Sequence, residues 1–119
     1  MSFSTFFAKN LSTHEHAKEA ELRPHYYAND YETIKLRVRE AAAQLKYTVV
    51  DINDDYHELF LEKRGVCDLI VTVIRNGVAG NRIDIKVNIN TGISFGGAKK
   101  AIKEFYSVVD PKLYRRDNR

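Results

Sequence analysis

The sequence predicts an α+β fold in which two long helices cover one face of a four-stranded antiparallel sheet, as a two-layer sandwich. Three observations predict it. One segment alternates apolar and polar residues throughout, two others carry apolar residues at helical spacing, and only a few residues separate the strands. Because parallel neighbours need crossovers of about a dozen residues or more, the short connections favour an antiparallel meander. The expected order is α-β-β-β-β-α, preceded by a short N-terminal helix and arm.

The alternating segment is Arg82–Asn90, with the sequence RIDIKVNIN. A period of two places every second side chain on the same face of a strand. Burying one branched apolar side chain fully contributes roughly 1.5–3 kcal/mol, so this strand requires a cover on one face. The side chains expected to face inward are Ile83, Ile85, Val87 and Ile89.

Three more strands are predicted before it, over Tyr47–Asn53, Tyr56–Lys63 and Val66–Arg75. Turn-forming residues separate them. Asparagine and aspartate end the first strand, Gly65 follows the second, and the loop Asn76–Asn81 follows the third. The side chains expected to face the helices are Leu59 and Leu61 in the second strand and Cys67, Leu69, Val71 and Val73 in the third.

Apolar spacing predicts the two long helices. Over Tyr31–Leu45 apolar residues recur in steps of four, three and four, which is typical of an amphipathic helix, with an N-cap at Asn29 or Asp30. The second helix is expected to start at about Phe95 or Gly97, and a proline ends it. The buried faces are expected to hold Ile34, Val38, Ala41 and Leu45 in the first helix and Ala98, Ile102, Phe105 and Val109 in the second.

The N-terminal part is predicted to contain a third, short helix. Ser12 and Glu15 have the spacing of a capping box, which favours a helix over about Thr13–Leu22. Pro24 disfavours helical geometry at the residue before it, so we expect an extended linker from there to residue 30. The expected organisation is an arm over residues 1–28, the α+β domain over 29–111 and a basic tail over 112–119.

Composition limits the class of protein. With 119 residues, 44% of them hydrophobic, the chain is long enough for one domain with its own core. Its single cysteine, Cys67, excludes an internal disulfide and fits a reducing compartment. No stretch approaches the roughly 20 apolar residues that span a bilayer, so we expect a cytoplasmic protein that binds no membrane. The formal net charge of +3 is small, and much of it lies in the C-terminal tail.

Two segments carry a resemblance. The stretches ELRPHYY (Glu21–Tyr27) and GISFGGAKKAIKEFY (Gly92–Tyr106), with the strand DIKVN between them, resemble a group of small uncharacterised bacterial cytosolic proteins. The predicted helix–four-strand–helix order is also similar to a wider domain family of unknown function. The resemblance implies a two-layer α+β fold in the bacterial cytoplasm, and it implies no active site.

The stretch Gly92–Lys99 nearly matches a phosphate-binding loop. That loop needs lysine directly after its second glycine and then serine or threonine, whereas here Ala98 intervenes and Lys100 takes the place of the hydroxyl. Nucleotide hydrolysis is therefore not predicted. Free amides at a helix start beside lysines can still hold a phosphate or carboxylate, and the competing interpretation is that the glycines allow a tight turn and close packing. The anion-site residues would be Gly96, Gly97, Lys99 and Lys100.

Three other groups suggest chemistry, each with a simpler explanation. His14 and His16 would point about 200° apart on a helix, whereas metal binding needs convergent ligands, so solvated helix residues are the competing interpretation. Asp54–Glu58 is the densest group able to transfer protons, but turn formation explains its aspartates. Cys67 falls in the register of a buried face, where a thiol packs and reacts little. No metal, cofactor or catalytic residue is predicted.

The sheet face opposite the helices is predicted to be an interaction surface. Phe60, Ile70 and Ile74 should lie there, with Tyr47 or Val49 as a further member, and would form an exposed apolar patch unless something covers them. Two covers are compatible with the sequence. The N-terminal aromatic residues can fold over the patch, or two copies of the chain can share it. The aromatic residues of the arm are Phe3, Phe6 and Phe7.

The leading functional hypothesis is a small non-enzymatic module that acts by binding to itself, to a protein partner or to a small anionic ligand. An enzyme with a pocket between the helices and the sheet is the first alternative. It would require buried His, Asp or Glu side chains to converge there. A nucleic-acid surface is the second, and it is disfavoured because Glu104 and Asp117 dilute the basic residues. Those basic residues are Lys99, Lys100, Lys103, Arg115 and Arg116.

Overall fold

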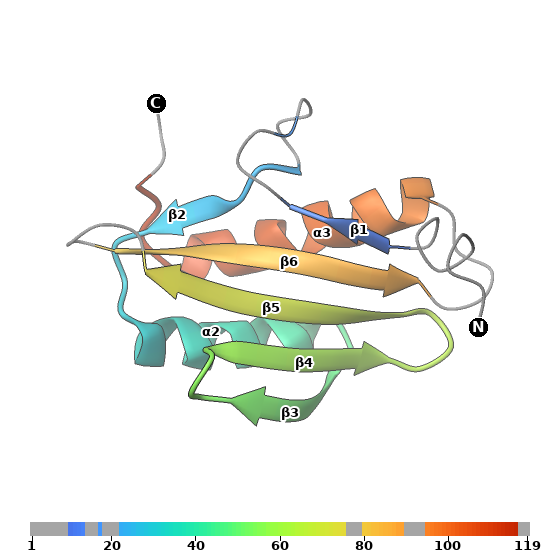
Figure 1. Ribbon diagram of the computed structural model, residues 1–119, viewed down its shortest axis with the longest axis horizontal. Helices are drawn as coiled ribbons and strands as arrows, with labels where there is room; N and C mark the ends of the chain where they lie inside the picture. The colour runs from blue at the N-terminus through green and yellow to red at the C-terminus, as the bar shows by residue number, and fades with distance from the viewer. Residues whose placement is uncertain (1–9, 14–16, 18–21, 76–79, 90–94, 117–119) are drawn as a thin grey trace.

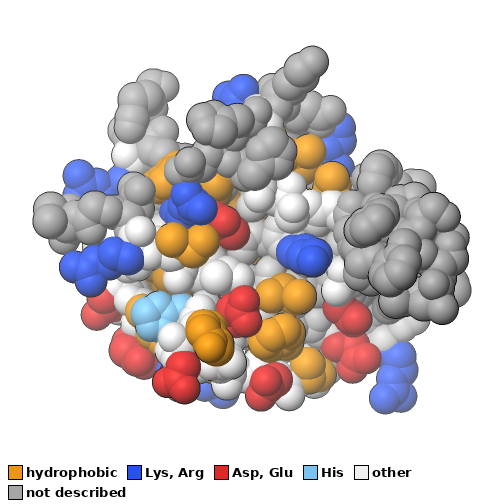
Figure 2. All heavy atoms as spheres, viewed as in Figure 1, with side chains coloured by type: hydrophobic (Ala, Val, Ile, Leu, Met, Phe, Trp, Pro, Cys, Tyr) orange, Lys and Arg blue, Asp and Glu red, His pale blue; other side chains and the backbone are white. Residues whose placement is uncertain are grey.

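The computed structural model describes residues 10–13, 17, 22–75, 80–89 and 95–116. These residues form an α+β fold with one six-stranded antiparallel sheet and two helices that lie behind it (Figure 1). The face of the sheet away from the helices, called the outer face below, is turned toward the viewer in Figures 1 and 2.

Four strands form an antiparallel meander, as the alternating pattern and the short connections predict. They are β3 (Thr48–Asn53), β4 (Glu58–Lys63), β5 (Cys67–Arg75) and β6 (Asn81–Ile89). The longest pairing joins β5 to β6 over nine residues of each strand. The strand expected at Arg82–Asn90 is thus present, shifted by one residue at each end.

Two further strands, β1 (Asn10–Ser12) and β2 (His25–Tyr27), pair antiparallel with the other edge of β6. The predicted four-stranded sheet is therefore wrong, and so is the predicted order of helices and strands. The order found is β1, β2, α2, β3, β4, β5, β6, α3. The error has a physical cause: a three-residue strand is too short to show alternation, although the exposed backbone groups of β6 require partners.

The predicted N-terminal capping box is also wrong, because Ser12 belongs to β1. Thr13 continues the pairing with β6. Its amide donates to the carbonyl of Ile85 at 2.9 Å, and its Oγ1 accepts from the amide of Ile85 at 3.0 Å. Of the short helix expected over Thr13–Leu22, residues 14–16 and 18–21 lie outside the described part of the chain, and Ala17 is not helical.

The two long helices agree with the sequence. In α2 (Tyr31–Gln44) the N-cap is Asp30, one of the two candidates, and its side chain accepts from the amide of Thr33 at 2.9 Å. The second helix is α3 (Phe95–Val109), and a 3₁₀ turn, η2 (Asp110–Lys112), follows it with Pro111 inside. Each helix buries the face that its apolar spacing indicates, except that Leu45 is the C-cap of α2 and is only partly buried.

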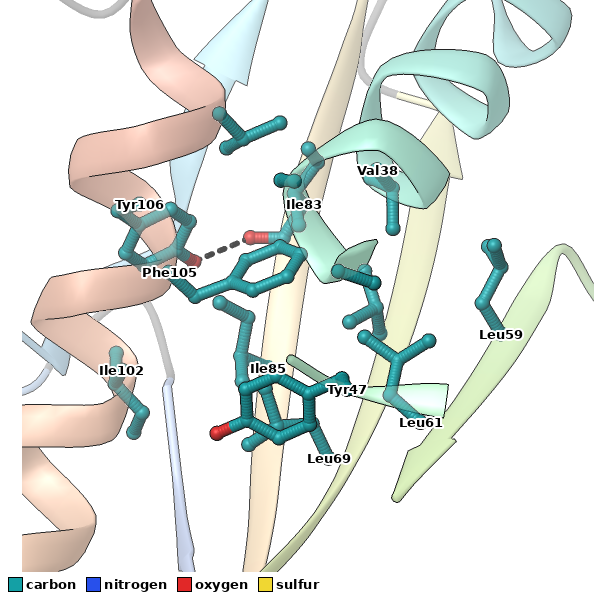
Figure 3. Packing of buried hydrophobic residues seen from close by; sticks show 14 of the residues in the cluster. Val38, Tyr47, Leu59, Leu61, Leu69, Ile83, Ile85, Ile102, Phe105 and Tyr106 are labelled. Atoms are coloured by element: carbon teal, nitrogen blue, oxygen red, sulfur yellow. Dashed lines mark hydrogen bonds between the residues drawn. The ribbon is translucent and has the colours of Figure 1, made fainter. Parts of the chain in front are cut away.

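The core fills the layer between the helices and the inner face of the sheet (Figure 3). Phe105 and Ile102 of α3 pack there with Val38 of α2. Tyr106 also lies in this layer, and its hydroxyl donates to the carbonyl of Ile83 at 2.6 Å. The sheet contributes the residues that the alternation predicts, namely Leu59, Leu61, Cys67, Leu69, Val71, Val73, Ile83, Ile85 and Val87, whereas the side chain of Ile89 lies outside the description.

The segment after η2 pairs with the edge of β2 that faces away from β6. The amide of Ala28 donates to the carbonyl of Tyr114, and the amide of Arg116 donates to the carbonyl of Tyr26, both at 2.8 Å. Tyr27 of β2 is almost fully buried in the common core. The division of the chain at residues 28 and 112 stays a prediction. Backbone hydrogen bonds nevertheless join β2 to β6 and to the segment of residues 114–116, so residues on both sides of each boundary are paired with one another.

Candidate functional site

The outer face of the sheet carries an apolar centre. Phe60 of β4 lies directly opposite Ile70 of β5, and Ile74 lies further along β5. All three are partly buried, whereas their neighbours in sequence Leu59 and Leu61 are fully buried on the inner face. The structure thus places these three predicted residues on the predicted face, and binding through them stays a prediction.

One row of side chains crosses four strands through this centre. The pairing places Lys86 beside Ile70, Ile70 beside Phe60, and Phe60 beside Asp51. We call these four residues the central row. Neighbouring strands lie about 4.8 Å apart, so the row measures roughly 14 Å between its two charged ends. It is positive at the β6 end, apolar in the middle and negative at the β3 end.

The rest of the outer face is predominantly acidic near β3 and β4. Figure 2 shows acidic side chains gathered in the lower half of the view, where Figure 1 places these strands. Glu62 of β4 lies opposite Asp68 of β5, and burial together with the charge of Glu62 raises the pKa of Asp68. On β6, Arg82 and Asp84 form an ion pair at 3.0 Å.

A bulge changes the membership of this surface. The pairing of β3 with β4 shifts between Val49 and Asp51, and Val50 is 55% exposed as a result. The sequence had suggested Tyr47 or Val49 as a further member of the patch. Tyr47 is buried in the core, and Val49 packs against the core, so neither extends the outer face. An irregular strand cannot be read from alternation, because the bulge interrupts the period.

A second group of residues surrounds the carboxylate of Asp110, just after α3. His25 Nδ1 lies 3.0 Å from both carboxylate oxygens. The hydroxyl of Tyr27 donates to Oδ1 at 2.5 Å, and a guanidinium nitrogen of Arg115 donates to Oδ2 at 2.8 Å. The ring of His25 stacks on Tyr106 with the centroids 3.6 Å apart. We call Asp110 with His25, Tyr27 and Arg115 the Asp110 cluster.

Charge and burial oppose each other in the Asp110 cluster. Burial acts to raise the pKa of Asp110, but the hydrogen bonds from His25 and Tyr27 and the charge of Arg115 lower it below its usual value overall. Burial and the neighbouring carboxylate raise the pKa of Tyr27. Each oxygen of Asp110 therefore has partners, and the cluster joins β2, the end of α3 and the C-terminal segment.

Sequence reasoning missed the Asp110 cluster. Asp110 lies 85 residues from His25, and no local pattern connects them. One signal was available, because residues two apart in an extended segment share a face, and His25 and Tyr27 lie in the segment expected to be extended. The enzyme alternative required buried His, Asp or Glu side chains that converge between the helices and the sheet. Asp110 and His25 converge at the end of the helical layer, but both are only partly buried.

The acidic turn between β3 and β4 is fastened to the start of α2. Asp54 Oδ1 accepts from the hydroxyl of Tyr31 at 2.6 Å and from Lys35 Nζ at 3.0 Å. These two hydrogen bonds lower the pKa of Asp54. His57 stacks on Tyr31 with the centroids 4.0 Å apart. These contacts hold the turn against α2, so they give its polar residues a structural role at the surface.

Cys67 is buried, as its register predicts. Its Sγ lies 3.4 Å from the hydroxyl of Tyr47. Burial is the largest influence on the thiol and raises its pKa, which keeps the fraction of reactive thiolate low. Lys63 Nζ lies over the Tyr47 ring, 4.5 Å from its centre.

The remaining predicted sites are only partly described. Gly96 and Gly97 lie in the first turn of α3, with Lys99 partly buried and Lys100 exposed, and anion binding there stays a prediction. The predicted arm aromatics Phe3, Phe6 and Phe7 and the histidines His14 and His16 lie outside the described residues. Within the described ranges, no three His, Cys, Asp or Glu side chains come together as metal ligands would.

No protein-family model and no curated protein matches the chain. The resemblance to small bacterial cytosolic proteins therefore stays a prediction. Neither helix in the described part of the chain has the length and apolarity needed to cross a membrane.

Proposed function

We propose that this chain is a non-enzymatic protein-interaction module that binds a partner through the outer face of its sheet. One observation carries the proposal: Phe60, Ile70 and Ile74 form an apolar centre on the face opposite both helices, with charged residues around it. Specific interfaces commonly combine an apolar centre with a polar rim. The bacterial cytoplasm, which the resemblance implies, is the proposed location.

The energetics of this face favour association over solvent exposure. Apolar area removed from water contributes roughly 25 cal/mol per Å², so covering what remains exposed of the apolar centre is favourable. The charged rim contributes less affinity, but it selects the partner and its orientation. A partner must bring apolar groups to Phe60 and Ile70, an anionic group to Lys86, and cationic groups to the side that holds Asp51 and Glu58.

The Asp110 cluster supports binding over catalysis as the function. A general base needs a proton acceptor that faces a substrate. In this cluster both oxygens of Asp110 accept hydrogen bonds from the protein itself, and the face of the His25 ring is stacked on Tyr106. These contacts hold three segments together, which is a structural task.

Site-specific photocrosslinking in cells tests the proposal. The photoreactive residue p-benzoylphenylalanine is placed at Phe60 of the outer face or, as the matched control, at Leu36, which is 50% exposed on α2. We expect a discrete protein adduct from position 60, and no adduct or a much weaker one from position 36. The adduct should also weaken when Lys86→Glu is added. Equal labelling from both positions, or none from position 60, contradicts an interaction through this face.

A further inference from the structure

We infer that the partner of the outer face is a second copy of the same chain, bound face to face about a two-fold axis that runs parallel to the strands, between β4 and β5. This inference rests on the proposed function and specifies its partner. The central row carries it, because the row is complementary to itself when it is reversed.

The geometry follows from the order of the four residues. A half-turn about an axis between Ile70 and Phe60 exchanges the two ends of the row. Lys86 of one copy then faces Asp51 of the other, and Ile70 faces Phe60, and each of these contacts occurs twice. Such an isologous arrangement closes on itself as a dimer. Sheets that stack in this way keep their strands within about 30° of each other, so the central row is the part that stays in register.

Charge selects this axis over the other aligned two-fold axis. An axis along the row, perpendicular to the strands, would place each strand over its own copy. Lys86 would then face Lys86 and Asp51 would face Asp51, which places like charges together at both ends of the row. The axis parallel to the strands replaces both repulsions by attractions.

The size of the face predicts a weak dimer. β5 and β6 have nine residues each, whereas β3 and β4 have six. At about 3.4 Å per residue and about 4.8 Å between strands, the face measures at most roughly 30 by 15 Å and buries at most about 900 Å² over both copies. Interfaces of that size are typical of transient complexes. In addition, the half-turn places Asp68 of one copy over Glu62 of the other, and this like-charge contact opposes association. We therefore expect a dimer that depends on concentration.

A charge-swap experiment tests the arrangement. The mass of the purified chain is followed by sedimentation equilibrium from micromolar to millimolar concentration, and it should rise from 13.7 kDa toward twice that value. In the dimer, Lys86→Glu alone creates two pairs of like negative charges, and Asp51→Lys alone creates two pairs of like positive charges. Each single variant should weaken association about tenfold, and the double variant should recover to within about threefold of the wild type.

Lys103→Glu is the matched control, because it makes the same charge change at an exposed position of α3. Its mass should depend on concentration as that of the wild type does. Far-UV circular dichroism and the melting temperature verify that each variant is folded. Three results would overturn the inference: a monomer over the whole concentration range, an association insensitive to both single changes, or a double variant no better than the singles. A crosslink from position 60 to a different protein would keep the proposed function and reject the second copy as partner.

Discussion

The two faces of the sheet are made by the same strands, yet they place different demands on the sequence. On the inner face one row runs through Val49, Leu61, Leu69 and Val87, and every member is apolar. The adjacent row on the outer face is the central row, charged at both ends and apolar in the middle. The inner row needs only apolar side chains of suitable size. In the outer row the position of each charge matters, which is typical of a surface that recognises something.

The largest effect should come from comparing two neighbours in β5. Leu69 is fully buried, so Leu69→Ala should lower the free energy of unfolding by about 2–5 kcal/mol. Ile70 is only partly buried, and Ile70→Ala should cost about 1 kcal/mol. Urea unfolding followed by circular dichroism measures both. Equal losses would mean that the outer face is as important to the core as the inner one, and would remove the basis of the comparison.

The Asp110 cluster should show the next largest effect. Asp110→Asn removes a charged acceptor from three donors and should cost about 1–3 kcal/mol at neutral pH. The pKa of Asp110 is lowered by folding, so its contribution to stability is complete above the unfolded-state pKa, which lies near 4. The contribution is lost as the pH falls through the lower pKa of the folded state.

Urea unfolding of the wild type and Asp110→Asn at a series of pH values from 7 to 3 checks the sign. The difference in stability between the two proteins should be largest at neutral pH and shrink toward pH 3. Asp30→Asn is a positive control, because the carboxylate of Asp30, at the exposed N-cap of α2, also has a lowered pKa and its stability difference should likewise shrink toward pH 3. A difference that stays constant with pH would show that Asp110 is not charged in its cluster.

A smaller effect is expected at the edge of β6 that pairs with β1. Thr13→Val removes the hydroxyl that accepts from the amide of Ile85, and should cost about 1 kcal/mol. Hydrogen exchange gives the sharper measurement. The amide of Ile85 should exchange faster in the variant, while the amide of Leu69, in the interior of the sheet, should change only by the loss of global stability. Unchanged exchange at Ile85 would contradict the pairing of Thr13.

The sequence predicted the regular half of the molecule and missed the irregular half. Alternation identified β4, β5 and β6 to within about two residues, because one face of each strand is continuously apolar. It could not identify β1 and β2, since three residues contain too little pattern. The Ser12–Glu15 spacing was misleading because Ser12 pairs with β6 as part of a strand instead of capping a helix.

The same difference applies to the candidate sites. The apolar centre was predictable, because Phe60, Ile70 and Ile74 break an otherwise polar outward pattern. The central row was not, because it depends on the register between strands, including the bulge that places Asp51 opposite Phe60. The Asp110 cluster depends on tertiary contacts between segments far apart in the chain. Local sequence patterns record neither register nor tertiary contact.

The smallest expected effect lies beside the central row. Glu62→Gln should change the free energy of unfolding by less than about 0.5 kcal/mol, because Glu62 lies on the surface of the sheet. It should nevertheless lower the pKa of Asp68, since the charge of Glu62 is the second cause, after burial, of the raised value. A side-chain carboxyl titration by NMR measures that pKa.

In the proposed dimer Glu62 also faces Asp68 of the second copy, so Glu62→Gln should tighten association by a few-fold. Glu40→Gln on α2 removes the same charge from an exposed helical position and should do neither. If Glu62→Gln lowers the pKa of Asp68 but does not tighten association, Glu62 and Asp68 interact within one chain and do not meet across the proposed dimer. An unchanged pKa of Asp68 would assign its whole shift to burial.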